Sequence, residues 1–488
     1  MKTGHDILCG ISLLETHGDL SSEIIGLSID SREVGNDFAF FAYKGYSADG
    51  HIYIPAAIAL GASLIICEEL PEELLDHITY VKVEDCKKAI GIAAANFYNH
   101  PSNSIELVGI TGTNGKTTVA TLCYQLFKDM GYQVGLLSTI QNLIDDVIYP
   151  STHTTSNAIN INKLLREMVD KGCQYAFMEV SSHAIDQDRI YGLNFIGGVF
   201  NNISHDHLDY HETFSNYIYA KKKFFDQLPK EAFALVNIDD KRGEVMLQNC
   251  AAKHHTFALK SIADFHAKIL ESNFNGLALH INNTEVYTRL IGQFNAYNIL
   301  SVFGVASLLG ENPFETLRVI STLTGAQGRF EWIKSKNDGV IGIVDYAHTP
   351  DALKNVLDTV NEVKMGAERL ITIFGCGGDR DHEKRPKMGH IATELSDIVI
   401  ITSDNPRSEE PMSIIQEIKK GVPVHRLKNT FVKEARKEAI RMAVSLTQKN
   451  VIIMIAGKGH EEYQEIKGEK HTFNDKAILQ ATFKEMNK

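Results

Sequence analysis

The chain has 488 residues, 44% of them hydrophobic and 23% charged, which is the balance of a globular protein long enough for about three domains. The formal net charge of -12 argues against nucleic acid as a partner, although a local cluster of cations and amides could hold a small anion. Seven cysteines without a CxxC pair support neither a disulfide framework nor a zinc site, and no apolar run could span a membrane, so we expect a reduced, cytoplasmic protein.

Residues 1–103 predict a small first domain of strands and helices. Its predicted elements are the strands Ile24–Ile29, Phe38–Ala42 and Ser63–Cys67 and the helix Ile54–Leu60. Turn-forming residues without periodicity, Pro101-Ser102-Asn103-Ser104, predict a linker at its end.

The sequence pattern of residues 104–328 predicts a second domain with a mostly parallel sheet. A buried strand, Ile105–Thr111, precedes a glycine-rich turn and a helix that Gly131 ends. The apolar face of that helix is Val119, Leu122, Cys123, Leu126 and Met130. Further predicted strands are Tyr175–Val180, Ile196–Phe200 and Phe233–Asn237. Strands that alternate with helices indicate a parallel sheet covered on both faces.

The sequence pattern of residues 329–488 predicts a third domain. Because each of the three predicted domains combines strands with helices, we expect the whole chain to be of the α/β class. Its predicted strands are Val340–Tyr346, Leu370–Phe374, Asp397–Thr402 and Val451–Ala456. Helical segments separate these strands, which again indicates layers of helices on a sheet.

The glycine-rich turn of the second domain is the strongest local signal for a phosphate site. It reads Gly112-Thr113-Asn114-Gly115-Lys116-Thr117-Thr118. Backbone N–H groups and the start of the following helix can hold phosphate oxygens, Lys116 can reach the β- and γ-phosphates, and Thr117 or Thr118 can ligate Mg²⁺. The spacing is shorter than usual because position 110 is Ile, and the alternative is a plain glycine turn. Such a loop names no reaction by itself.

Several polar residues near this loop allow two interpretations each. Glu179 ends a strand and suits Mg²⁺, but could also pair with a surface lysine. The segment His205–His211 could bind a metal on one side of an extended loop, with zinc as a rival, although the usual zinc spacings are missing. Lys221 lies in a run that reads as a solvated helix face. Asn298 precedes an apolar helix and could read a nucleotide or cap the helix.

The predicted strands of the third domain end in polar motifs. These are Asp345-Tyr346-Ala347-His348, Gly375–Asp381, Ser403-Asp404-Asn405-Pro406-Arg407 and Ala456–Glu461. The glycines do not complete a dinucleotide fingerprint. The mixture of Arg, Asp, Asn and Glu predicts one polar crevice that suits a zwitterionic, amino-acid-like ligand.

In this order the motifs resemble those of the Mur ligase family, and the resemblance runs from Asp30-Ser31-Arg32 and Asp49-Gly50-His51 to the final helix. It implies a small N-terminal α/β domain for a uridine nucleotide, a central P-loop ATPase-like domain and a C-terminal Rossmann-like domain. The sequence departs from the family at Ser156-Asn157 and at Ala326-Gln327. The first departure leaves details of the sugar-peptide contact open.

The resemblance implies a role for each matching residue. Lys116 and Thr117 would hold ATP and Mg²⁺, Glu179 and His207 would be metal ligands, and Lys221 would carry a carbamate that binds a second Mg²⁺. Residues implied at the ATP are Asn298, Arg329 and Asp345, with His348 in the same motif. Residues implied at the nucleotide-sugar peptide are Ser31, Thr154, Thr155, Ser182 and Arg189. Residues implied at the amino acid are Arg380, Asp404, Asn405, Arg407, Gly457 and Glu461.

The implied activity is an ATP-dependent amide ligation in peptidoglycan synthesis. It would join meso-diaminopimelate to UDP-N-acetylmuramoyl-L-alanyl-D-glutamate, because Arg407 can grip the second carboxylate of diaminopimelate that lysine lacks. The alternatives are the same reaction with L-lysine, a folylpolyglutamate-synthetase-like ligase, and an inactive nucleotide-binding paralogue. We expect a monomer.

Overall fold

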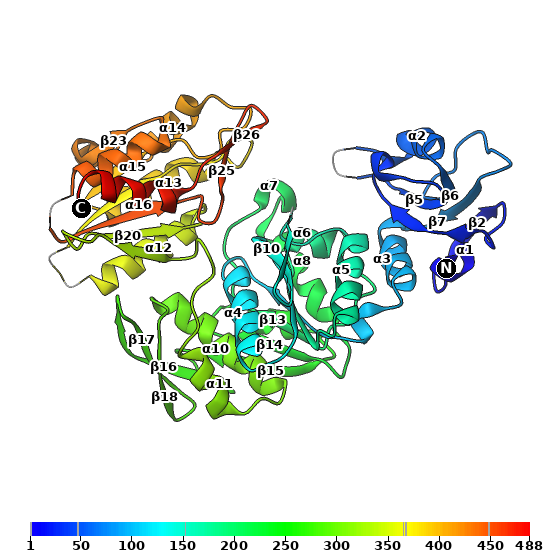
Figure 1. The fold of residues 1–488 in the computed structure, drawn as a ribbon, viewed down its shortest axis with the longest axis horizontal. Coiled ribbons are helices and arrows are strands. Elements are labelled where there is room, and N and C mark those ends of the chain that lie inside the picture. The colour runs from blue at the N-terminus through cyan, green and yellow to red at the C-terminus, as the bar shows by residue number, and fades with distance from the viewer. Residues whose placement is uncertain (1, 46–47, 152, 365, 367, 448) are drawn as a thin grey trace.

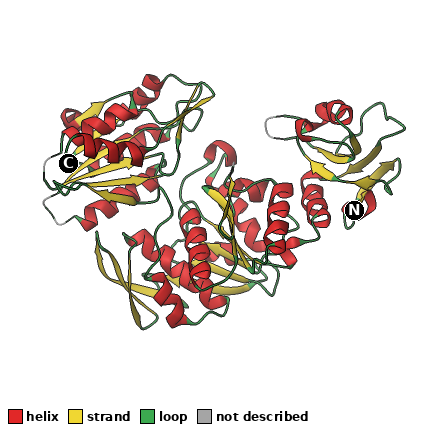
Figure 2. Cartoon of the chain, in the orientation of Figure 1, coloured by secondary structure: helices red, strands yellow, loops and turns green. Residues whose placement is uncertain are grey.

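The computed structural model describes residues 2–45, 48–151, 153–364, 366, 368–447 and 449–488. Figure 1 shows three lobes in chain order, with the two chain termini on the outer lobes. Each lobe combines strands with helices (Figure 2), which confirms the predicted three-part α/β fold. The residue boundaries at 103/104 and 328/329 stay predictions. Among the described residues, no helix is both long and apolar enough to cross a membrane.

The N-terminal lobe is built on a sheet of order β2-β7-β6-β5-β4, in which only β2 is antiparallel to its neighbour. Its elements are β1 (Lys2–Thr3), α1 (Gly4–Ile7), β2 (Leu13–His17), β3 (Glu23–Ile24), β4 (Gly26–Ser28), η1 (Ser31–Glu33), β5 (Phe38–Ala42), η2 (Gly50–Tyr53), α2 (Ile54–Ala59), β6 (Ala62–Cys67), β7 (Thr79–Val83) and α3 (Cys86–Phe97). The single strand predicted over Ile24–Ile29 is wrong. The chain leaves β3, which pairs with β1, and enters β4, which pairs with β5, while Ile25 between them is 55% exposed.

The predicted linker at 101–104 lies between α3 of the first lobe and β8 (Glu106–Thr111) of the second, and it is packed against the second lobe. Pro101–Asn103 forms a 3-10 turn, η3, in which Pro101 and Ser102 are buried. The backbone N–H of Asn194 donates to Ser102 Oγ at 3.0 Å. Ala158 of the central lobe packs in one cluster with Ile90 of α3. The turn formers therefore fix the first lobe against the second.

The central lobe has the strand order β11-β10-β9-β12-β8-β13-β14-β15-β16-β17-β18, which is parallel from β9 to β16. Its strands are β8 (Glu106–Thr111), β9 (Val134–Leu137), β10 (Gln141–Ile144), β11 (Val147–Pro150), β12 (Tyr175–Glu179), β13 (Gly197–Phe200), β14 (Phe233–Asn237), β15 (Lys253–Ala258), β16 (Phe265–Asn273), β17 (Gly276–Ile281) and β18 (Thr284–Thr288). Its helices are α4 (Lys116–Asp129), α5 (Ala158–Asp170), α6 (Ser182–Asp186), α7 (Leu208–His211), α8 (Phe214–Asp226), α9 (Gly243–Leu247), α10 (Gln293–Leu308) and α11 (Pro313–Ile320). The mostly parallel sheet is confirmed, and antiparallel hairpins extend both of its edges.

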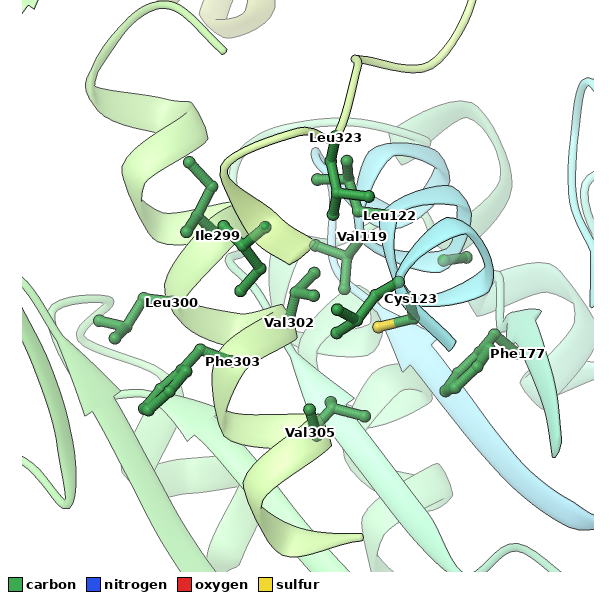
Figure 3. Close-up of a cluster of buried hydrophobic side chains, with 14 of the residues drawn as sticks. Val119, Leu122, Cys123, Phe177, Ile299, Leu300, Val302, Phe303, Val305 and Leu323 are labelled. Carbon is green, nitrogen blue, oxygen red and sulfur yellow. The ribbon is translucent and has the colours of Figure 1, made fainter. Parts of the chain in front are cut away.

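One core of this lobe lies between the sheet and the pair α4 and α10 (Figure 3), and a second packs α5, α6 and α8 against the sheet. The predicted face of α4, from Val119 to Leu126, is buried against Val302 and Val305 of α10. Apolar contact along the whole of α4 holds the first turn of that helix at one place relative to the sheet, which is where the phosphate loop lies.

The C-terminal lobe has the strand order β19-β20-β24-β21-β22-β23, antiparallel only at β19. Its strands are β19 (Glu331–Lys334), β20 (Ile341–Asp345), β21 (Arg369–Phe374), β22 (Ile398–Ile401), β23 (Thr430–Val432), β24 (Val451–Ala456), β25 (Tyr463–Ile466) and β26 (Glu469–Thr472). Its helices are α12 (Pro350–Val363), α13 (Lys384–Leu395), α14 (Pro411–Lys419), η4 (Val424–Asn429), α15 (Arg436–Ser445) and α16 (Asp475–Glu485). The polar motifs predicted at strand ends follow β20, β21, β22 and β24.

Candidate active site

A cavity of about 660 Å³ lies where the central and C-terminal lobes meet. One wall is the glycine-rich loop, the ends of β12 and β13, and the first turn of α10. The other wall is the segment after β20 together with α12. Residues far apart in sequence, such as Lys116 and His348, therefore face the same space.

The glycine-rich loop has the predicted position between a strand, β8, and a helix, α4. Gly115 has a φ of 84°, which favours glycine, and a Cβ there would lie 2.7 Å from Asn298 Oδ1 and displace that side chain. The ammonium of Lys116 donates to the carbonyl oxygens of Gly112 at 2.9 Å and Thr113 at 3.0 Å. Burial lowers the pKa of Lys116, and the nearby Glu179 carboxylate opposes this. The loop can hold an anion beside a cation.

Glu179 and Thr117 form the oxygen-rich part of the site. Glu179 is 0% exposed, so pairing with a surface lysine is wrong. The Thr117 hydroxyl donates to Glu179 Oε2 at 2.9 Å, and the Thr139 N–H donates to Oε1 at 2.7 Å. A carboxylate and a hydroxyl at the phosphate loop are hard oxygen donors that fit Mg²⁺. Arg329, which comes from the C-terminal lobe, donates to Thr117 Oγ1 at 3.2 Å and so joins the lobes.

Only the last four residues of the histidine segment are helical, because α7 spans Leu208–His211 and residues 205–207 precede it. His207, directly before α7, and His211 within it both face His183, with ring centroids 4.7 and 5.5 Å away, whereas His205 stacks on Phe214. Burial lowers the pKa of His207 to about 3, so its ring is neutral near pH 7 and can ligate a metal. Within the described part of the chain, no group of three His, Cys, Asp or Glu could hold a metal ion, which gives zinc no support.

Lys221 is buried in α8, with an exposed fraction of 1%, and the solvated helix face is wrong. Its ammonium donates to the Gly112 carbonyl at 3.0 Å and lies 4.8 Å from the Tyr217 ring centroid. Burial, and next the like charge of Lys116, lower its pKa well below the usual value. A neutral amine at this depth is a nucleophile, as in other buried lysines.

Two of the residues predicted to contact ATP, Asn298 and Asp345, line the cavity. Asn298 lies inside α10, whose cap residue Gly292 has no side chain, so helix capping by Asn298 is wrong. Asp345 accepts from the N–H groups of Phe330 and Ala347, each at 2.7 Å. Burial raises the pKa of Asp345, and the nearby Arg329 opposes this.

The residues expected at the nucleotide-sugar peptide cluster around Glu179, with one exception. Thr139 Oγ1 donates to Thr154 Oγ1 at 3.1 Å, and the Thr155 hydroxyl donates to the Glu179 carbonyl at 2.8 Å. The further contacts are Arg189 to the Thr155 carbonyl at 2.9 Å and Ser182 Oγ to His211 Nε2 at 3.0 Å. Ser31 lies apart, in η1 of the N-terminal lobe, and does not line the cavity.

The residues expected at the amino acid meet at the ends of β22 and β24. Asn405 Nδ2 donates to Glu461 at 2.8 Å, and a Cβ at Gly457 would lie 2.4 Å from Asp404 Oδ2. Arg407 donates to the Gly378 carbonyl at 2.6 Å and lies 3.4 Å from Glu465. Arg380 is exposed and lines a shallow hollow with Asp209 of the central lobe. The structure thus brings the residues at these two strand ends together, whereas Arg380 lies in the separate shallow hollow.

Sequence reasoning missed two kinds of residue. Asn202 donates to the Asn114 carbonyl and accepts from its N–H, at 3.2 and 2.9 Å, so it supports the phosphate loop. Its signal was a polar pair directly after a strand. Lys458 is fully buried and donates to Asn405 Oδ1 and Glu461 Oε2, each at 2.9 Å. Its signal was a lysine between two glycines at a strand end.

Known proteins resemble this chain along its length. Residues 23–98 match the Mur ligase family catalytic domain, 110–306 the Mur ligase middle domain, and 328–459 the Mur ligase glutamate ligase domain. UDP-N-acetylmuramoyl-L-alanyl-D-glutamate–2,6-diaminopimelate ligases of Phocaeicola vulgatus and Bacteroides fragilis are each 52% identical, over 98% of both chains. A solved structure of a ligase with the same name is 30% identical, with a TM-score of 0.70, over 100% of this chain and 99% of that one.

Proposed function

The chain belongs to the Mur ligase family, and we propose that it is an ATP-dependent amide ligase that adds meso-diaminopimelate to the D-glutamyl carboxyl of UDP-N-acetylmuramoyl-L-alanyl-D-glutamate in peptidoglycan synthesis. The observation that carries this function is the shared cavity, in which the phosphate loop of the central lobe faces the end of β20 and α12 of the C-terminal lobe. A monomer in the cytoplasm is part of the proposal.

The first half of the reaction joins the glutamyl carboxylate to the γ-phosphoryl of ATP. The carboxylate oxygen attacks phosphorus, the bond to ADP breaks, and an acyl phosphate results. Lys116 and the loop N–H groups stabilise the charge on the phosphoryl oxygens. Thr117, Glu179 and His207 would hold Mg²⁺, which when bound neutralises negative charge on the phosphates.

Lys221 has the burial and lowered pKa that carbamate formation needs. The neutral amine would add to the carbon of CO₂ and lose a proton, which yields an anionic carbamate. A buried cation then becomes an oxygen donor for a second Mg²⁺. Its position beside Gly112, at 3.0 Å, places that donor next to the phosphate loop.

The second half of the reaction brings in the amine. The amino nitrogen of diaminopimelate attacks the acyl carbon, phosphate leaves, and the ammonium proton is lost. Asp404, Asn405, Glu461 and Arg407 supply the donors and acceptors for a zwitterion, with Arg407 for the distal carboxylate. Gly457 lies against Asp404, and we assign it and Arg380 to the same amino-acid site.

Incubation with the UDP-dipeptide, ATP and an amino acid tests this function by mass. ADP, phosphate and a UDP-tripeptide should form only when all three substrates are present. Lysine as the sole productive amino acid would indicate the alternative specificity, and AMP with pyrophosphate would reject the acyl phosphate.

A further inference from the structure

A buried arginine, Arg436, joins separate parts of the C-terminal lobe. Its Nε donates to Asp475 Oδ1 at 2.9 Å, and one terminal nitrogen donates to Asp475 Oδ2 at 2.7 Å and to the Ala456 carbonyl at 2.9 Å. Both side chains of the pair are 0% exposed. Asp475 begins α16, and Ala456 ends β24. The guanidinium therefore fixes the final helix against the strand that leads into Gly457–Glu461.

The third neighbour of Arg436 is the carboxylate of Asp404. The other terminal nitrogen, Nη1, is buried without a hydrogen-bond partner and lies 3.8 Å from Asp404 Oδ2. A Cβ at position 457 would lie 2.4 Å from that same oxygen. The carboxylate is therefore held between the backbone of Gly457 and a buried positive charge, where attraction between opposite charges is weakly screened.

Both loops of the proposed amino-acid crevice thus depend on one guanidinium. Asp404 begins the segment that ends at Arg407, and Ala456 precedes the segment that ends at Glu461. Arg436 itself is covered on all sides and cannot touch a ligand. Its influence on a ligand must pass through Asp404 and Gly457.

We propose that Arg436, held by Asp475, is a positioning residue that aligns the Asp404 carboxylate with the Gly457 backbone for the incoming amine of the amino-acid substrate. This inference rests on the proposed function, because it gives those two loops the amino acid as their ligand. A displacement on the order of 1 Å at a reacting group can lower a rate about 100-fold, so a change behind the crevice has a measurable effect.

The competing explanation is an ion pair that only stabilises the lobe. The chain offers a matched control for it on the same two helices. Arg441 of α15 pairs with Glu485 of α16 at 2.7 Å, nearer to solvent. Among the described residues, the side chain of Arg441 bonds to Glu485 alone, so it joins the helices without Asp404 or Ala456.

The test compares Arg436→Lys and Arg441→Lys in the full chain. For Arg436→Lys we expect kcat/KM for diaminopimelate to fall roughly 10- to 100-fold, while the KM values for ATP and the UDP-dipeptide stay within about twofold. Arg441→Lys should leave kcat/KM for diaminopimelate and all three KM values unchanged. Asp475→Asn keeps the shape of the partner and should lower the same kcat/KM, so it replaces Arg436→Lys in the test if that variant does not fold.

A combined variant tests whether Arg436 acts through Asp404. If it does, Arg436→Lys with Asp404→Asn should use diaminopimelate no worse than Asp404→Asn alone. The positioning role would be overturned if the losses of the two single variants added up in the double variant. It would also be overturned if all three KM values of Arg436→Lys rose together as its melting temperature fell. A wild-type chain that shows no diaminopimelate-dependent turnover would instead overturn the proposed function.

Discussion

The hydroxyl of Thr117 donates to the carboxylate of Glu179 at 2.9 Å, across 62 residues of sequence. Thr117 lies in the first turn of α4, after β8, and Glu179 ends β12. These two strands are parallel neighbours, with Ile110 opposite Glu179. Because parallel strands end at the same edge of a sheet, the phosphate loop and the acidic residue meet there by topology.

Replacement of Lys116 by Met should abolish most ATP turnover without unfolding the chain. Among the described residues, the ammonium donates only to the loop carbonyls of Gly112 and Thr113, so we expect little loss of stability. Loss of a preorganised charge at the phosphoryl group should lower kcat roughly 10²- to 10³-fold, measured as phosphate release. Lys128→Met, on the same helix but paired with Asp145, is the control and should retain activity. Full activity of Lys116→Met would contradict the assigned role.

Gly115→Ala and Gly131→Ala separate backbone strain from crowding. Both glycines have positive φ, 84° and 97°, so each alanine should cost about 1–2 kcal/mol of unfolding free energy. At Gly131 a Cβ would meet nothing within 4 Å, whereas at Gly115 it would lie 2.7 Å from Asn298 Oδ1. We therefore expect loss of ATP binding, by calorimetry, only for Gly115→Ala. Equal ATP affinities in both variants would contradict this view of the loop.

The burial of Lys221 predicts a pH dependence of stability. Its pKa is lowered in the folded chain, from an ordinary value of 10.5 that the unfolded chain retains. At a pH between the folded and the unfolded pKa, Lys221 is protonated in the unfolded chain and neutral in the folded chain. Folding must then release this proton, which costs free energy, and this cost decreases as the pH rises toward 10.5. In the absence of CO₂, the melting temperature of the wild type should therefore rise relative to that of Lys221→Met as the pH increases. A constant difference would show that the lysine is solvated.

The same lysine should take up CO₂. In buffer with ¹³C-bicarbonate, the wild type should show a carbamate carbon signal by NMR. Lys221→Arg should lack the signal, because a guanidinium stays protonated. Lys222→Arg, which changes the adjacent buried lysine, should keep it. A signal in Lys221→Arg would place the modification elsewhere.

Arg407 should set the choice between diaminopimelate and lysine. Arg407→Leu removes the cation proposed for the distal carboxylate, and the loss of a charged hydrogen bond should lower kcat/KM for diaminopimelate roughly 10- to 100-fold. Lysine has no distal carboxylate and provides the internal control, so its rate should change little. An equal loss for both amino acids would mean that Arg407 supports the lobe and not the ligand.

Much of the fold could be predicted because apolar runs and glycines report local structure directly. The run 105–111 and the face from Val119 to Leu126 became β8 and the buried side of α4. The antiparallel strands from β16 to β18 were missed, since β16 and β18 are partly exposed and short polar turns join the three strands. The strand predicted through Ile25 failed because a β-branched residue can also lie in an exposed connection.

The site was less predictable because burial and partners are tertiary properties. Nothing local distinguishes Lys221 in its lysine run, yet it is the one placed under the phosphate loop. The family resemblance singled it out, and the packing of α8 supplies the physical reason. Arg436 and Asp475 gave no signal, since an ion pair between residues 39 apart has no sequence pattern.

The most direct test of the account is product analysis with purified protein, UDP-N-acetylmuramoyl-L-alanyl-D-glutamate, ATP and meso-diaminopimelate. We predict equal amounts of ADP, phosphate and UDP-tripeptide, with none formed when any substrate is omitted and far less tripeptide when L-lysine replaces diaminopimelate. ATP hydrolysis without an amide product in the complete mixture would contradict the ligase.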